Sequence, residues 1–238
     1  MRLKPWLVLP ALAALLLPFG HTWADDGAPA PSSVETNNID LTRILAPPPA
    51  PGSPEDKADL ETVLKLQAER TDAQAAACAA DEEYSVFRFA DVVGPAFDAA
   101  VLPATSAYFS RAIDVAKNAV ESSKDHWNRP RPYQLDTRVK PCVKLSKHSS
   151  YPSGHATAGT TMTILLADML PEMHDAIYAR GQLYIWHRVM GGAHNPTDVL
   201  AGRLAGTAIA QQLLYDPQMQ VLAKAARKEL RTALKLPL

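Results

Sequence analysis

Three short segments, residues 124–132, 151–155 and 187–198, concentrate side chains that could bind and attack an anion. Their side chains include three permanent cations, two histidines and one carboxylate that could act together: Lys124, Arg131, Arg188, His155, His194 and Asp198. Phosphoryl transfer needs these groups, because cations stabilise the transferred group while a nucleophile and an acid make and break its bonds. The residue types therefore indicate chemistry at a phosphate ester.

The spacing within the segments favours this interpretation. His194 and Asp198 are four residues apart, so one helical turn can bring the carboxylate to the imidazole and fix its tautomer. The other ring nitrogen is then free to attack. Ser153 and Gly154 open a predicted helix, whose free N–H groups suit an oxyanion. Each residue alone also has an ordinary structural explanation, since Ser153 could simply cap that helix. It is the combination that predicts a site.

The same segments resemble the three-part signature of bacterial class A non-specific acid phosphatases. These belong to the superfamily of type 2 phosphatidic acid phosphatases and vanadium haloperoxidases. The first part (Lys, six residues, Arg-Pro) and the second (Pro-Ser-Gly-His) are matched at residues 124–132 and 152–155. The third (Ser-Arg, five residues, His, three residues, Asp) is matched at residues 188–198, but His187 stands where the family has serine.

The resemblance, which extends over residues 40–214, implies a role for each residue. His194 is the nucleophile, Asp198 orients it, and His155 protonates the leaving oxygen and then activates water. The phosphate-binding set is Lys124, Arg131, Ser153, Gly154 and Arg188. No metal or cofactor is expected, because three fixed cations can supply the stabilisation that a metal often gives. The partners implied are small-molecule phosphate monoesters.

His187 has two interpretations. It either replaces the family serine and adds a titratable group near the anion, or it points about 100° away from Arg188 on its helix and packs. The second is favoured.

Three other functions fit parts of the pattern. A vanadium haloperoxidase would look similar, since vanadate mimics phosphate in the same pocket. A lipid-phosphate phosphatase is disfavoured by the lack of apolar spans after the N-terminus. A non-catalytic periplasmic anion-binding protein would need the cations, but not His155 or the pair of His194 and Asp198.

The N-terminal 24 residues have the pattern of a secretory signal peptide. Arg2 and Lys4 precede an apolar run over residues 6–19, and small residues follow at the cleavage positions. The alternative is a membrane anchor, but the run is short for a membrane span. We expect a periplasmic protein that begins at Asp25, and removal of Arg2 and Lys4 changes the net charge from −1 to −3. No basic run points to nucleic acid.

The chain has two cysteines, Cys78 and Cys142. An even number of cysteines in an oxidising compartment predicts a disulfide, and the alternative is two buried thiols. Their spacing fits no metal motif.

The remaining pattern is helical. A proline-rich arm is expected over residues 25–54 and an all-α domain over residues 55–238, without a convincing alternating strand. Helix starts are predicted at capping residues or prolines: Ser53, Thr71, Pro103, Ser153, Pro171, Asn195 and Asp216. The arm is either a linker or a contact with another subunit, and the family resemblance suggests a homodimer.

Overall fold

The computed structural model describes residues 39–238, and within that range it contains helices and no strand. The α-helices are α1 (Pro54–Glu69), α2 (Asp72–Ala80), α3 (Ala90–Val93), α4 (Pro103–Trp127), α5 (Pro132–Leu135), α6 (Gly154–Met169), α7 (His174–Met190), α8 (Pro196–Tyr215) and α9 (Pro217–Ala233). Three 3₁₀ turns join them: η2 (Leu41–Arg43), η3 (Val86–Phe89) and η4 (Pro171–Met173). The predicted all-α fold is confirmed.

The helices begin where the sequence places their caps. The Ser53 side chain accepts the N–H of Asp56 at the start of α1, and Thr71 and Gln74 form the predicted capping box of α2. The Asp216 side chain caps α9 in the same way. These side chains satisfy N–H groups that a helix cannot bond internally. Pro171, in contrast, starts a single 3₁₀ turn before α7.

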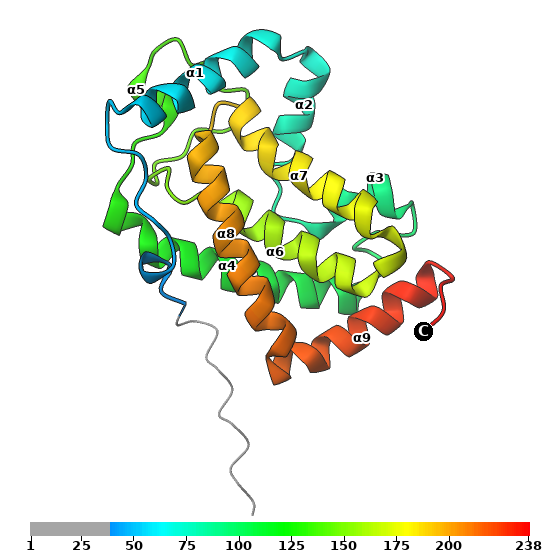
Figure 1. The fold of residues 1–238 in the computed structure, drawn as a ribbon. Coiled ribbons are helices and arrows are strands. Elements are labelled where there is room, and N and C mark those ends of the chain that lie inside the picture. The colour runs from blue at the N-terminus through cyan, green and yellow to red at the C-terminus, as the bar shows by residue number, and fades with distance from the viewer. Residues whose placement is uncertain (1–38) are drawn as a thin grey trace, which may run out of the picture. The chain divides into compact units, whose positions relative to one another are not determined.

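Helix α6 lies at the centre of the domain, between α4, α7 and α8 (Figure 1). It is apolar or small on nearly every face, as a buried helix must be. Helix α8 approaches it closely at Gly202, where a Cβ would lie 2.5 Å from the carbonyl oxygen of Ser153. Close packing of α6 and α8 brings their N-termini together, and both N-termini carry residues of the predicted site.

The predicted signal peptide and residues 25–38 of the arm lie outside the described residues. The described part of the arm packs against its own domain, because Leu41 and Leu45 belong to the hydrophobic core. The Tyr151 hydroxyl also donates a hydrogen bond to the Ala46 carbonyl at 2.5 Å. No helix within residues 39–238 is both long and apolar enough to cross a membrane.

The predicted disulfide is absent from this structure, in which Cys78 and Cys142 are both free. The two thiols are neighbours, and burial together with the Cys142 thiol raises the pKa of Cys78 to about 12. Since the thiolate is the form that reacts, this burial disfavours oxidation of Cys78.

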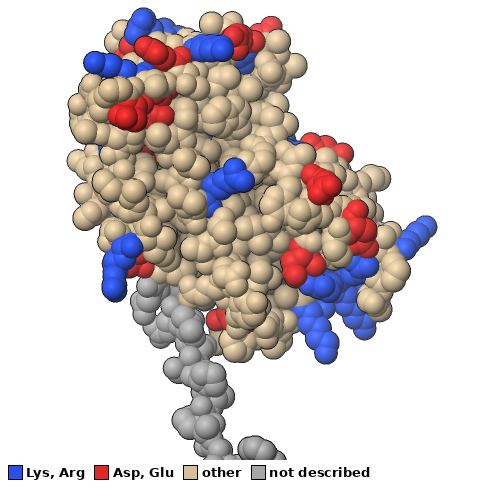
Figure 2. Space-filling view, viewed as in Figure 1, with Lys and Arg blue, Asp and Glu red and all other residues tan. Residues whose placement is uncertain are grey.

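Charged side chains are unevenly distributed over the surface. In Figure 2 many of them lie at the top of the view and at the lower right, while the face formed by α7 and α8 is largely uncharged apart from a basic side chain near its middle. An apolar groove of about 530 Å³ lies on that face, with Leu183, Trp186 and Leu200 partly exposed in it. This groove is separate from the residues that the sequence singles out.

Candidate active site

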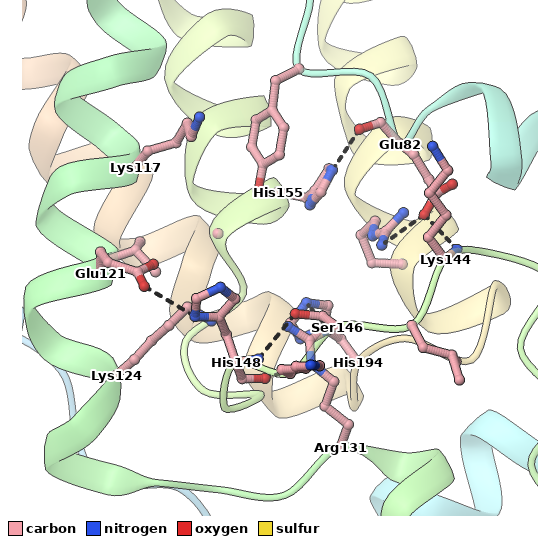
Figure 3. Close-up of a pocket in the computed structure, with 16 residues that line it drawn as sticks. Glu82, Lys117, Glu121, Lys124, Arg131, Lys144, Ser146, His148, His155 and His194 are labelled. Carbon is pink, nitrogen blue, oxygen red and sulfur yellow. Dashed lines mark hydrogen bonds and ion pairs between the residues drawn. The ribbon is translucent and has the colours of Figure 1, made fainter.

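One pocket of about 520 Å³ gathers most of the predicted site residues (Figure 3). Its walls come from the C-terminal halves of α4 and α7, the N-terminus of α6, the segment that leads into α8, and the loop over residues 144–148. The predicted residues that line it are Lys124, Arg131, Gly154, His155, Arg188 and His194. Helix ends distant in sequence therefore meet here, and Figure 3 shows His194 and Arg131 at one end of the pocket.

Two of the three cations are held by backbone carbonyl groups. The Lys124 ammonium donates to the Ser149 carbonyl at 2.7 Å, and Arg131 Nε donates to the His148 carbonyl at 2.9 Å. Burial, followed by repulsion from Arg131, lowers the pKa of Lys124 to about 8. Cations that are held by carbonyl groups, and not by direct hydrogen bonds to carboxylates, can still bind an anion.

The third cation, Arg188, has hydrogen-bonding capacity that the protein does not use. Its side chain is buried, and within residues 39–238 its Nε and Nη1 atoms have no hydrogen-bond partner. The carboxylate of Glu82 lies 3.9 Å from Nη2, too far for a hydrogen bond. Buried unsatisfied N–H groups are costly in folded proteins, so their presence at a pocket indicates an anion site.

His194 lies fully inside this cationic environment. Its Nε2 is 3.1 Å from Arg131 Nη1, and its Nδ1 is 3.3 Å from the Ser150 hydroxyl. Burial is the largest reason that the pKa of His194 falls to about 3, and repulsion from Arg131 adds to it. The ring is therefore neutral in the resting site, as a nucleophile must be.

Asp198 lies beside His194, but the expected direct hydrogen bond is absent. The distance from His194 Nδ1 to Asp198 Oδ2 is 3.7 Å, which is too long. Oδ2 instead accepts the Ser150 hydroxyl at 2.6 Å and the Asn195 N–H at 2.8 Å. The prediction from spacing correctly brought the two residues together, but it overlooked the competing donors.

A buried arginine, Arg129, donates a hydrogen bond to the other carboxylate oxygen of Asp198. Arg129 Nη1 donates to Asp198 Oδ1 at 2.7 Å, and its Nη2 binds Asp56 and Asp59 of α1 at 2.8 and 2.9 Å. Burial raises the pKa of Asp198, but its contacts with His194, Arg129 and Ser150 outweigh burial and hold that pKa below its usual value. Asp198 is therefore ionised and fixed in place.

His155 lies across the pocket from His194. Its Nε2 is 2.8 Å from the Glu82 carbonyl, and its ring contacts Tyr84 with centroids 3.8 Å apart. A carbonyl only accepts, so Nε2 carries a proton and Nδ1 remains available. Burial and then the charge of Arg188 hold the pKa of His155 well below its usual value.

Ser153 and Gly154 differ in position. Gly154 lines the pocket, whereas the Ser153 hydroxyl is fully buried and caps α6 by accepting the Ala156 N–H at 3.3 Å. The Ser153 N–H donates to the Asp198 carbonyl at 3.0 Å. The structure thus gives Ser153 a capping contact rather than a place among the lining residues.

Comparison with known proteins agrees with this geometry. The model of the PAP2 superfamily matches residues 100–221, slightly more than half of the chain, and this range includes all the predicted catalytic and phosphate-binding residues. This chain belongs to the PAP2 superfamily. The resemblance inferred from the three motifs is thereby confirmed.

Several relatives in this superfamily are similar over most of their length. An acid phosphatase of Zymomonas mobilis is 32% identical over 212 residues, covering 85% of this chain and 80% of that protein. A non-specific acid phosphatase of Salmonella typhimurium is 29% identical over 222 residues, covering 88% and 87%. The solved structure of a bacterial vanadium-dependent iodoperoxidase is 18% identical, with a TM-score of 0.47 over 70% of this chain and 52% of that chain. The chain thus spans about half of the iodoperoxidase.

His187, which departs from the superfamily motif, faces away from the pocket. It is buried, and its Nδ1 lies 2.7 Å from Asp81 Oδ2. Asp81 also binds the buried Arg180 and the partly exposed Arg88, so the four side chains form one cluster that joins α7, η3 and the end of α2. The substitution is therefore accommodated by a hydrogen bond to Asp81 outside the pocket.

Several residues of this PAP2 site were not found by sequence reasoning. Among them are Ser150, Arg129, Glu82 and Tyr84. The first two had a detectable signal, because Arg129 lies inside the first motif and Ser150 lies two residues before the second. Glu82 and Tyr84 follow α2, far along the chain from every motif, and only the fold brings them to His155.

Proposed function

We propose that this protein is an acid phosphatase that hydrolyses small phosphate monoesters through a phosphohistidine intermediate on His194. The observation that carries the proposal is the position of His194 in one pocket with Lys124, Arg131 and Arg188. Arg188 adds two buried N–H donors with no partner among residues 39–238. The relatives named acid phosphatases support the same reaction.

In this mechanism the substrate phosphate binds among the three cations and the N-terminus of α6 at Gly154. His194 Nε2 attacks phosphorus, and Arg131, which contacts Nε2 in the resting site, moves its hydrogen bond to a phosphate oxygen. The bond between phosphorus and the ester oxygen breaks as the bond to Nε2 forms. The surrounding cations stabilise the charge on the equatorial oxygens.

His155 completes the cycle from the opposite side of the pocket. The cations that depress its pKa are those that a bound phosphate neutralises, so substrate binding favours its protonated form. It then donates a proton to the leaving oxygen and takes one from the water that hydrolyses phosphohistidine. Ser153 supports this arrangement by capping α6, and Asp198 by holding the segment that carries His194.

No metal or cofactor has a step in this mechanism. Lys124, Arg131 and Arg188 place three positive charges where a catalytic metal would stand, and cations so close repel a divalent ion. The proposed setting is the periplasm, which follows from the predicted signal peptide and the resemblance.

The test of the proposed function uses purified protein and a chromogenic phosphate ester. We expect hydrolysis that persists in excess EDTA, competitive inhibition by vanadate, and acid-labile phosphate on His194. His194→Ala abolishes both turnover and labelling, while His174→Ala, an exposed histidine of α7, changes neither. Loss of activity in EDTA that a divalent ion restores would contradict metal independence. Halide oxidation by the vanadate-loaded protein without phosphatase activity would favour the haloperoxidase alternative.

The role of His155 is tested with two leaving groups. An alkoxide needs a proton as it departs and a nitrophenolate does not, and general acid catalysis contributes about 10²–10⁴-fold. His155→Ala should therefore slow phosphorylation by an alkyl phosphate far more than by nitrophenyl phosphate, as rapid mixing would show. It should also accumulate phosphohistidine, because water is no longer activated. Equal losses for the two substrates would show that His155 is not the general acid.

A further inference from the structure

The hydrogen bonds around His194 determine which ring nitrogen carries its proton. Arginine only donates, so the 3.1 Å contact between Arg131 Nη1 and His194 Nε2 requires Nε2 to accept. Because the resting ring is neutral, its single proton lies on Nδ1. This tautomer leaves the Nε2 lone pair available for attack, which is the form that the proposed function needs.

The partner of that Nδ1 proton is a serine. Asp198 Oδ2 lies 3.7 Å from Nδ1, whereas the Ser150 hydroxyl lies 3.3 Å from Nδ1 and 2.6 Å from Oδ2. An ionised carboxylate only accepts, so Ser150 donates its own proton to Asp198. The free lone pairs of the hydroxyl are then available to accept from His194 Nδ1.

The position of Ser150 is fixed by burial and by hydrogen bonds of its backbone and side chain. Its side chain is fully buried, and its N–H donates to the Arg129 carbonyl at 2.7 Å. Arg129 also binds the far oxygen of Asp198 at 2.7 Å. The carbonyl groups of the two preceding residues hold Arg131 and Lys124. One short segment therefore positions both the serine hydroxyl and two of the phosphate-binding cations.

We propose that Ser150 is a positioning residue that relays the charge of Asp198 to His194 and fixes the attacking tautomer. This rests on the proposed function for its catalytic consequence, but not for the tautomer itself. When Nε2 forms its bond to phosphorus, the imidazole becomes cationic and keeps its Nδ1 proton. The hydrogen bond to Ser150 then strengthens, because Ser150 is polarised by an ionised carboxylate.

The kinetic test compares Ser150→Ala with Ser123→Ala. Both serines are buried, but the Ser123 hydroxyl bonds only the Val120 carbonyl within α4. Ser150→Ala should lower kcat by about 10–100-fold, the worth of one hydrogen bond to a charged group. KM should change little, because Ser150 does not line the pocket. Ser123→Ala should keep kcat. A rise in KM at constant kcat would overturn the relay.

A double-mutant cycle with Asp198→Asn separates a relay from an independent structural role. If Ser150 acts through Asp198, then Ser150→Ala should lower kcat by less than about threefold in the Asp198→Asn background. If the fold-loss in kcat of the double variant equals the product of the two single fold-losses, the proposal is overturned.

Nitrogen-15 NMR of histidine-labelled protein reads the tautomer without any activity measurement. The wild-type spectrum, assigned by difference from His194→Gln, should show Nδ1 protonated and Nε2 unprotonated. Ser150→Ala should increase the fraction protonated at Nε2. Wild-type protein with its proton on Nε2 would overturn the inference even if Ser150→Ala fails to fold. If the protein has its His194 proton on Nδ1 but no phosphatase activity, the proposed function is contradicted while the inference about the tautomer stands.

Discussion

At the scale of single residues, the pocket stores positive charge at the expense of stability. Lys124, Arg131 and Arg188 are each at least nine-tenths buried, and burial lowers the pKa of both Lys124 and Arg131. In a protein built only for stability, such groups would be paired with carboxylates. Here the carboxylate of Asp198 is bound by Arg129 instead, and the nearest carboxylate oxygen to Arg188, that of Glu82, is 3.9 Å away, so the cations keep hydrogen-bonding capacity for a ligand.

This arrangement predicts an alkaline limit to activity. The pKa of Lys124 is about 8 in the empty site, so its ammonium is present below pH 8 and is lost above it. Since kcat/KM reports the free enzyme, we expect kcat/KM to fall as pH rises through about 8. In Lys124→Arg this alkaline fall should move upward or disappear, because a guanidinium does not titrate there. An unchanged fall in that variant would assign it to another group.

At the scale of elements, the side of the pocket that holds His155 depends on contacts made behind it. Two side chains of α7, Arg180 and His187, bind the carboxylate of Asp81. Asp81 directly precedes Glu82, and the Glu82 carbonyl accepts a hydrogen bond from His155. Burial opposes the ionisation of Asp81, but hydrogen bonds from His187 and Arg180 lower its pKa to about 2. The helix that supplies Arg188 to the pocket thus also anchors the segment opposite it.

Replacing His187 with the serine of the family motif should affect stability more than catalysis. His187→Ser removes a buried hydrogen bond to a charged group, worth about 1–3 kcal/mol. For a chain of this size, the corresponding fall in Tm is about 2–12 °C. The value of kcat should stay within about threefold, because Arg180 and Arg88 still hold Asp81.

Calorimetry and steady-state kinetics of the same preparation check this expectation. His174→Ser on the same helix is the control, since its pair with Asp175 is exposed and should contribute little to stability. An inactive His187→Ser protein with an unchanged Tm would reveal a catalytic role for His187.

At the scale of the whole molecule, the site is held by most of the described fold. Its residues come from α4, α6, α7 and the start of α8, and Arg129 connects Asp198 to Asp59 of α1. The hydroxyl of Thr197, in the first turn of α8, donates to Asp59 as well. Because the pocket requires these elements to be packed together, anion binding is coupled to global folding.

Inorganic phosphate should therefore raise the Tm of the intact protein. A ligand at 100 times its Kd stabilises the folded state by about 2.7 kcal/mol, which corresponds to a rise of about 5–10 °C here. Arg188→Ala should lose most of this rise, while Arg203→Ala, an exposed arginine of α8, should retain it. Differential scanning fluorimetry with phosphate, and with chloride at equal ionic strength, measures the effect. An equal rise in both variants would place phosphate elsewhere.

The sequence by itself determined the helices and the identity of most site residues, because both depend on local information. Helix caps such as Ser53 and Thr71 act within one turn, and motif spacing fixes which residues share a helix end. The contacts of Asp198 were decided only by the tertiary structure. Ser150 lies 48 residues away from it and Arg129 lies 69 residues away, and both compete with His194 for its oxygens. Burial likewise set the pKa values, because desolvation depends on what packs around a group rather than on its neighbours in sequence.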